Sequence, residues 1–222
     1  MRYVFYEGVF EVNTIEKIYK IINQKYEKEE DFNKTYVDCK KKKDAESCYK
    51  FLIRWNRGIG ILKSLESKKF LISNIKEILN AKIYNDCDFF LFINRKLNES
   101  VGNKKDLRVP TIKLFHILKN NYPLIDNGIA KYIVGQKSNY LQKYKNKPEK
   151  LFNFINTYKY CIDISYKKYF GDEQPNYKII DEYLFLKIIK KDKNLKIDDN
   201  FENMIKEIKN CMYLKRKNKE IL

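Results

Sequence analysis

The sequence predicts a mostly α, compact multi-helix domain, and three observations support this prediction. Apolar residues recur with a helical period along most of the chain. A hydrophobic content of 44% over 222 residues is enough for one sizeable core. Stretches rich in proline or glycine, which would mark linkers, do not interrupt roughly the first hundred residues. We therefore expect a single domain over residues 1–222, with 1–135 and 136–222 as candidate sub-lobes.

The first part of the chain combines an extended run with several amphipathic segments. Residues 1–12 predict a short strand or an irregular arm. Segments with one apolar side, each expected to be helical, cover residues 15–22, 44–65, 72–83 and 87–97. Trp55, the only tryptophan, lies on the apolar side of its segment, so we expect it to anchor the core rather than to stack on a base.

A helix, a tight corner and a second helix are predicted for residues 109–135. Pro110 suits the first turn of a helix. The apolar residues that follow it are Leu114, Phe115, Ile117 and Leu118. Pro123 then imposes an extended or turn conformation on the residue before it. Asp126 follows where a carboxylate can accept backbone hydrogen bonds from the next helix, expected over residues 128–134.

The last third of the sequence predicts more helices. Helical spacing of apolar residues covers 140–151, then the long run 151–170, then 177–190. Asp181 in the third of these is expected to be a surface or capping carboxylate. Residues 200–216 predict a final helix with a basic end, which would serve as a lid, a partner helix or an extra packing layer.

The cysteines and the hydropathy exclude several classes of protein. The five cysteines are widely spaced, odd in number and lack any CxxC pair, so we expect reduced thiols and no zinc or iron-sulfur site. Because the chain has no long uncharged apolar run and its start carries Glu7 and Glu11, we expect a cytoplasmic protein that does not bind membranes. No metal or cofactor is expected, and no paired-carboxylate motif for a nuclease is present.

The formal charge of +17 favours a polyanionic partner, namely nucleic acid and in particular DNA. An AT-rich genome, which raises Lys, Asn, Ile and Tyr together, is the alternative explanation. One basic cluster is interleaved with tyrosines, whose rings can stack on bases; otherwise it is a solvated helix face. The DNA-binding candidates from these patterns are Arg54, Arg57, Lys137, Tyr140, Lys143, Tyr144 and Lys145.

The stretch VPTIKLFHILKNNYPLIDNGIAKYIVG resembles a segment of the helix-hairpin-helix DNA glycosylase superfamily, in which a Leu-Pro-Gly-x-Gly hairpin runs into a helix, a turn and an aspartate that opens another helix. The resemblance implies a glycosylase-like fold, with hairpin amides that bind a DNA phosphate and an aspartate that assists loss of a flipped base. It places the hairpin at residues 109–113, which adds Thr111 and Lys113 to the DNA contacts, and the aspartate at Asp126. The stretch also resembles small, uncharacterised bacterial and phage proteins.

The sequence departs from the glycosylase pattern at three positions. The two hairpin glycines fall on Thr111 and Lys113, which weakens the expected phosphate grip. Lys113 is therefore read as a phosphate contact or, more simply, as a solvated lysine. The lysine that forms a Schiff base in bifunctional members falls on Phe115. The resemblance therefore implies a hydrolytic glycosylase rather than a lyase.

Two residues are candidates for catalysis, and each has a simpler structural interpretation. Asp126 would stabilise the positive charge that develops on the sugar, or it caps its helix. His116, the only histidine, would act as an acid or base, or it is a hydrogen-bonded residue at the edge of the core. Two functions therefore follow: a DNA glycosylase, or a non-catalytic nucleic-acid-binding or protein-interaction scaffold related to mobile elements or defence.

Overall fold

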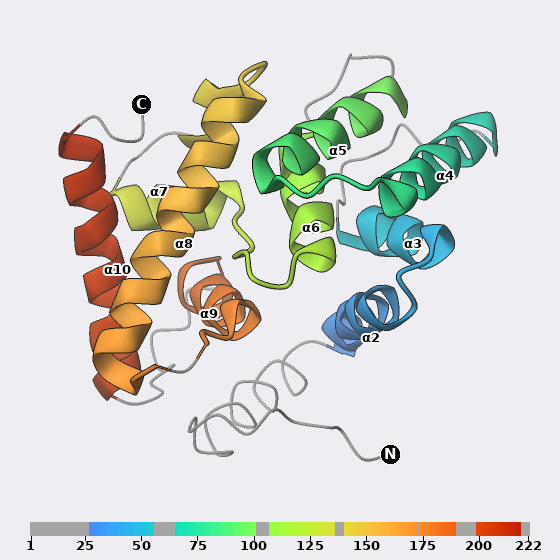
Figure 1. Cartoon of the computed structure of the whole chain (residues 1–222). Helices are drawn as coiled ribbons and strands as arrows, with labels where there is room; N and C mark the ends of the chain where they lie inside the picture. Colours follow the sequence, from blue (N-terminus) through green and yellow to red (C-terminus); the bar gives the residue numbers. More distant parts are fainter. Residues whose placement is uncertain are drawn as a thin grey trace.

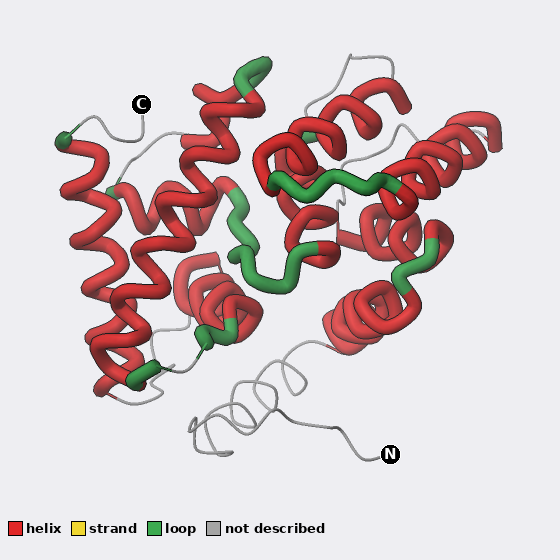
Figure 2. Tube along the Cα trace, in the orientation of Figure 1, coloured by secondary structure: helices red, strands yellow, loops and turns green. Residues whose placement is uncertain are grey.

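The prediction of a mostly α, compact multi-helix domain is confirmed. The computed structural model describes residues 27–55, 65–100, 107–135, 140–172, 174–189 and 199–218, and these ranges contain helices and loops but no strand (Figure 2). The α-helices are α2 (Glu27–Lys42), α3 (Ala45–Trp55), α4 (Leu65–Asn80), α5 (Asp86–Ser100), α6 (Arg108–Leu118), α7 (Asn127–Val134), α8 (Pro148–Phe170), α9 (Tyr177–Leu184) and α10 (Asp199–Lys217). The predicted N-terminal strand or arm and the predicted helix over 15–22 lie outside the described residues.

The helices form two groups that lie next to each other (Figure 1). In one group, which runs from α2 to α6, each of the helices from α2 to α5 packs against the helix that follows it in the chain. Helix α6 also contacts α2 and α3. In the other, α8 and α10 lie side by side, and α7 packs against α10, the short helix η1 (Tyr140–Tyr144) and the π-helix η2 (Phe185–Ile189). The change of group therefore falls between α6 and α7.

The hydrophobic core continues from one group into the other. Phe90 of α5 contacts Phe115 of α6 and Phe152 of α8, with ring centroids 5.3 and 5.6 Å away. Phe115 and Phe152 are themselves 5.9 Å apart. Because these rings are almost completely withdrawn from water, their burial stabilises the contact between α5 and α8 as well as each group.

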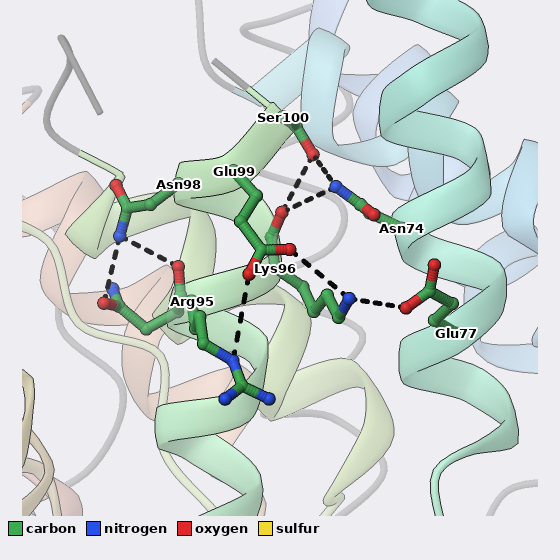
Figure 3. A network of polar contacts seen from close by, with 8 residues as sticks. Asn74, Glu77, Arg95, Lys96, Asn98, Glu99 and Ser100 are labelled. Carbon is green, nitrogen blue, oxygen red and sulfur yellow. Dashed lines mark hydrogen bonds and ion pairs between the residues drawn. The ribbon is translucent and has the colours of Figure 1, made fainter. Parts of the chain in front are cut away.

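A polar network fixes the packing of α4 against α5 (Figure 3). The buried amide of Asn74 donates to the carbonyl oxygen of Lys96 at 3.0 Å and to the hydroxyl of Ser100 at 2.8 Å. The ammonium group of Lys96 contacts Glu77 of α4 at 2.5 Å and Glu99 of α5 at 3.3 Å. Since the amide of Asn74 is buried and both of these bonds reach α5, the network specifies one register between the two helices.

Residues 109–113 form part of α6, so the prediction of a phosphate-binding hairpin there is wrong. The backbone N–H of Thr111 donates to the carbonyl of Leu107 at 2.8 Å, as in a regular helix. Threonine and lysine at the hairpin's glycine positions leave no residue suited to its tight turn. Pro110 lies in the first turn of the helix, as its fixed φ angle favours.

Two of the five cysteines form a disulfide, so the prediction that all are reduced is wrong. Cys161 of α8 and Cys211 of α10 are bonded, although 50 residues separate them. An ion pair between Lys168 and Glu207, at 2.9 Å, joins the same two helices. The close packing of α8 against α10 brings the cysteines together, and no short spacing in the sequence indicates it.

Candidate functional site

Asp126 opens α7, as the sequence predicts. Its backbone is extended, and its Oδ1 accepts a hydrogen bond from the N–H of Ile129 at 2.8 Å. Gly135 ends the helix in the left-handed conformation, with φ 64°. A cap at each end explains why only eight residues form a defined helix. The carboxylate itself is half-buried, so it is held in place at the N-terminus of α7 without being sealed from its surroundings.

Asp181 of α9 adds a second carboxyl group, which interacts electrostatically with Asp126. The side chain is buried, with 8% of the residue exposed. Burial raises its pKa to about 8, and the negative charges of Asp126 and Glu182 act in the same direction. The expectation that Asp181 is a surface or capping carboxylate is therefore wrong.

Lys113 of α6 supplies the positive charge opposite these two acids. The residue is half-buried, but its ammonium group is withdrawn from solvent. Burial lowers its pKa to about 8, whereas attraction to Asp181 and then Asp126 opposes this shift. The expectation of a solvated lysine is therefore wrong.

Tyr158 of α8 completes what we call the charged cluster, which consists of Lys113, Asp126, Asp181 and Tyr158. The tyrosine is buried, and burial raises the pKa of its phenol, with smaller effects of Asp181 and Asp126 in the same direction. The cluster thus combines residues of α6, α8 and α9 with the residue that precedes α7. A buried ammonium with a lowered pKa and a buried carboxyl with a raised pKa, within electrostatic range of each other, are a combination typical of catalytic sites.

His116 lies in the core and connects three segments. Its Nδ1 is 2.5 Å from the carbonyl oxygen of Tyr122, and its Nε2 is 2.9 Å from the hydroxyl of Tyr36. A carbonyl oxygen only accepts, so Nδ1 carries the proton and Nε2 accepts from Tyr36. Burial lowers the pKa of the imidazole to about 4. The geometry fits the hydrogen-bonded core residue, which was the simpler of the two interpretations of His116.

The tyrosines of the predicted DNA-binding cluster face inward, which contradicts their role as stacking platforms. Tyr140 and Tyr144 are buried, and their ring centroids lie 5.2 and 5.5 Å from that of Phe154. The one short turn of η1 places both rings against α8. Lys143 and Lys145 remain exposed, so the cationic part of the cluster is still available to a polyanion.

Of the other predicted DNA contacts, one is buried, one is exposed, and two lie outside the described residues. Thr111 is buried, where its hydroxyl donates to the carbonyl of Leu107 at 2.7 Å and accepts from Asn94 at 3.1 Å, so it does not face DNA. Arg54 is exposed in the last turn of α3. Arg57 and Lys137 lie outside the described residues.

Sequence reasoning missed Asp181 and Tyr158 as members of the cluster. A signal for Asp181 was present, because it follows Tyr177 by four residues and precedes Leu184 by three, on the apolar side of α9. An acidic residue on such a side either disrupts the core or has a partner there. Within the described part of the chain, no group of three or more His, Cys, Asp and Glu side chains is arranged to hold a metal ion. In the same part, no helix has both the length and the apolar character required to cross a bilayer.

Comparison of the chain with models of protein families, with curated proteins and with solved structures finds no match. The resemblance of residues 109–135 to glycosylases therefore rests on the residues themselves.

Proposed function

We propose that this protein acts on DNA and hydrolyses the N-glycosidic bond of a flipped base. The observation that supports the proposal is the charged cluster. Asp126, the residue that the glycosylase resemblance places beside the sugar, is half-buried and interacts electrostatically with a lysine and a second carboxyl group that are buried. The charge of +17 would attract the DNA, and a cytoplasmic location, expected from the sequence, would give access to it.

The members of the cluster suit different parts of this reaction. Loss of the base builds positive charge on the sugar, and a fixed carboxylate at Asp126 would stabilise that charge. With a pKa of about 8, Asp181 keeps its proton over much of the neutral range and would donate it to the departing base. The positive charge of Lys113 attracts both acids and opposes the raised pKa of Asp181.

The environment of Lys113 also supports a second reaction. An amine with a pKa of about 8 has a larger unprotonated fraction at neutral pH than an ordinary lysine, and unprotonated amines attack sugar carbons to form imines. Lyase activity, which the sequence pattern disfavours, is therefore tested beside hydrolysis. Borohydride would reduce an imine between Nζ and the sugar to a stable adduct, which Lys113→Gln would lose.

The test of hydrolysis compares the wild type with Asp126→Asn on duplexes that each carry one damaged base. Asparagine keeps the oxygen that caps α7 and removes only the charge. We expect strand breakage after alkali with the wild type and a decrease of at least about 100-fold in rate with the variant. Asp88→Asn, an exposed change on α5, is the matched control and should cleave like the wild type. Equal cleavage by Asp126→Asn would contradict the proposed role.

The second candidate function is a non-catalytic nucleic-acid-binding or protein-interaction scaffold. It is favoured by the hydrogen bond that Asp126 makes to its own helix and by the helical conformation of residues 109–113. The same experiment separates the two functions. Binding of the duplexes by both proteins, without cleavage of any of them, would identify a scaffold.

A further inference from the structure

Two buried thiols face each other where α2 packs against α3. Cys39 of α2 and Cys48 of α3 are both fully withdrawn from solvent. Their sulfur atoms are 3.1 Å apart, with the thiol of Cys39 donating toward Cys48. A disulfide bond is about 2.05 Å long, so the two sulfurs need to approach by only about 1 Å to form one.

The corner between α2 and α3 holds these thiols in place. Lys43 adopts the left-handed conformation, with φ 46°, directly after α2. Asp44 then caps α3, because its Oδ1 accepts from the N–H of Ser47 at 2.8 Å. The backbone of Lys43 is tied to α2 by a bond from its N–H to the carbonyl of Cys39, at 2.9 Å. A corner fixed on both sides leaves the two cysteines few alternative partners.

We propose that Cys39 and Cys48 form a redox-active dithiol, which a low-molecular-weight disulfide such as oxidised glutathione converts to an intramolecular disulfide. One cysteine thiolate attacks the small disulfide and releases one reduced thiol. The second cysteine then attacks the mixed disulfide and releases the other. Two protons and two electrons leave the protein, and one glutathione disulfide becomes two glutathione molecules.

The same contacts predict that this oxidation is slow in the folded protein. The hydrogen bond to Cys48, and then burial, raise the pKa of the Cys39 thiol. The thiolate is the reactive form, so exchange requires the α2–α3 corner to open first. Cys87, the remaining free cysteine, is only half-buried and lies on α5, so it is the natural internal reference for an accessible thiol.

The test uses the full chain carrying Cys161→Ser and Cys211→Ser, in which Cys39, Cys48 and Cys87 are the remaining cysteines. The reduced protein is incubated with oxidised glutathione, unfolded, and alkylated without reductant, and the alkyl groups are counted by mass spectrometry. We expect no alkylation of Cys39 or Cys48, and a peptide pair that contains both. Peptide mapping of the oxidised wild type should find the same link, so the result does not depend on the serine variant folding.

A second readout is the thermal stability of the oxidised protein. Closure of the bond should raise the Tm by on the order of 5 °C, reversibly with dithiothreitol, because it constrains the unfolded chain. Cys48→Ser should abolish the rise. Recovery of Cys39 and Cys48 as alkylated thiols, as separate glutathione adducts, or bonded to Cys87 would overturn the proposal.

Discussion

Burial shifts the pKa values of Asp181 and Lys113 toward neutrality, and this has a measurable effect on stability. An aspartate in the unfolded chain titrates near pH 3.9, but in the fold the pKa of Asp181 is about 8. The unfolded state therefore loses its proton first, so this group lowers stability as the pH rises from about 4 to about 8. The lowered pKa of Lys113 acts in the opposite direction between about pH 8 and 10.4.

We therefore predict that Asp181→Asn gains stability relative to the wild type as the pH rises. Asparagine imitates the protonated acid, so the two proteins should be similar near pH 4, where the carboxyl of the unfolded chain begins to lose its proton. The difference should then grow by up to about 1.4 kcal/mol per pH unit toward pH 8. Urea unfolding at pH 5, 6, 7 and 8 measures it, with the exposed change Asp88→Asn as control. Parallel pH profiles for Asp181→Asn and the wild type would show that Asp181 is ionised in the fold.

Tyr36→Phe tests the structural interpretation of His116. The change removes the hydroxyl that donates to Nε2 and leaves that buried nitrogen without this bond. We expect a loss of about 1–3 kcal/mol in the free energy of unfolding. Tyr84→Phe is the control, because Tyr84 is 89% exposed and should change stability by less than about 0.5 kcal/mol. If Tyr36→Phe were equally silent, the hydrogen bond would not contribute to the stability of the fold.

At the residue scale, the sequence indicates side-chain chemistry better than side-chain surroundings. The capping position of Asp126 follows from local spacing, and the structure confirms it. The burial of Asp181, Tyr140 and Tyr144 depends on helices that are distant in the sequence, so composition and charge do not reveal it. The stretch rich in Lys and Tyr suggests a nucleic-acid-binding surface, but the rings of Tyr140 and Tyr144 pack against α8.

At the scale of single elements, the N-terminus of α7 separates the structural role of Asp126 from its charge. Asp126→Ala removes the oxygen that accepts from Ile129, and we predict a loss of about 1 kcal/mol in the free energy of unfolding. Asp126→Asn keeps an acceptor there and should be within a few tenths of a kcal/mol of the wild type. Thermal and urea unfolding of the three proteins give the comparison. A similar loss in both variants would mean that the charge, and not the cap, stabilises the helix.

Helices with a strong apolar side were predictable, and those without one were not. The run that becomes α8 repeats its apolar residues with helical spacing, and it is a continuous helix. Helix α2 has the sequence EKEEDFNKTYVDCKKK, whose many charges hide the few residues that face the core. Tyr36 and Cys39 are buried residues of α2, and each bonds to another helix: Tyr36 to His116 of α6 and Cys39 to Cys48 of α3.

At the scale of the whole molecule, the charged cluster exists because the two groups of helices meet. Lys113 belongs to the first group. Tyr158 and Asp181 belong to the second group, and Asp126 directly precedes its first helix, α7. The segment that joins α6 to α7 runs between the groups (Figure 1). A sequence pattern within residues 109–135 therefore indicated part of the site, but α8 and α9 supply the rest through contacts that no local spacing encodes.

The overall charge of +17 raises the question of whether DNA would bind at one surface or at any basic surface. Lys143 and Lys145 are exposed on and beside η1, and the ammonium of Lys143 lies 4.0 Å from the ring centroid of Tyr140. Lys76 and Lys82, on and just after α4, are also exposed and serve as a control with the same charge. Each phosphate contact contributes about 0.9 to the slope of log affinity against log salt.

We predict that Lys143→Gln with Lys145→Gln lowers this slope by about 2, because two phosphate contacts are lost. Lys76→Gln with Lys82→Gln should leave the slope unchanged, since a diffuse field alone releases no counterions from a particular phosphate. Fluorescence anisotropy of a labelled duplex between about 50 and 200 mM salt measures both. Equal decreases in the two double variants would mean that binding follows net charge, and that the basic composition of the chain, rather than a defined surface, attracts DNA.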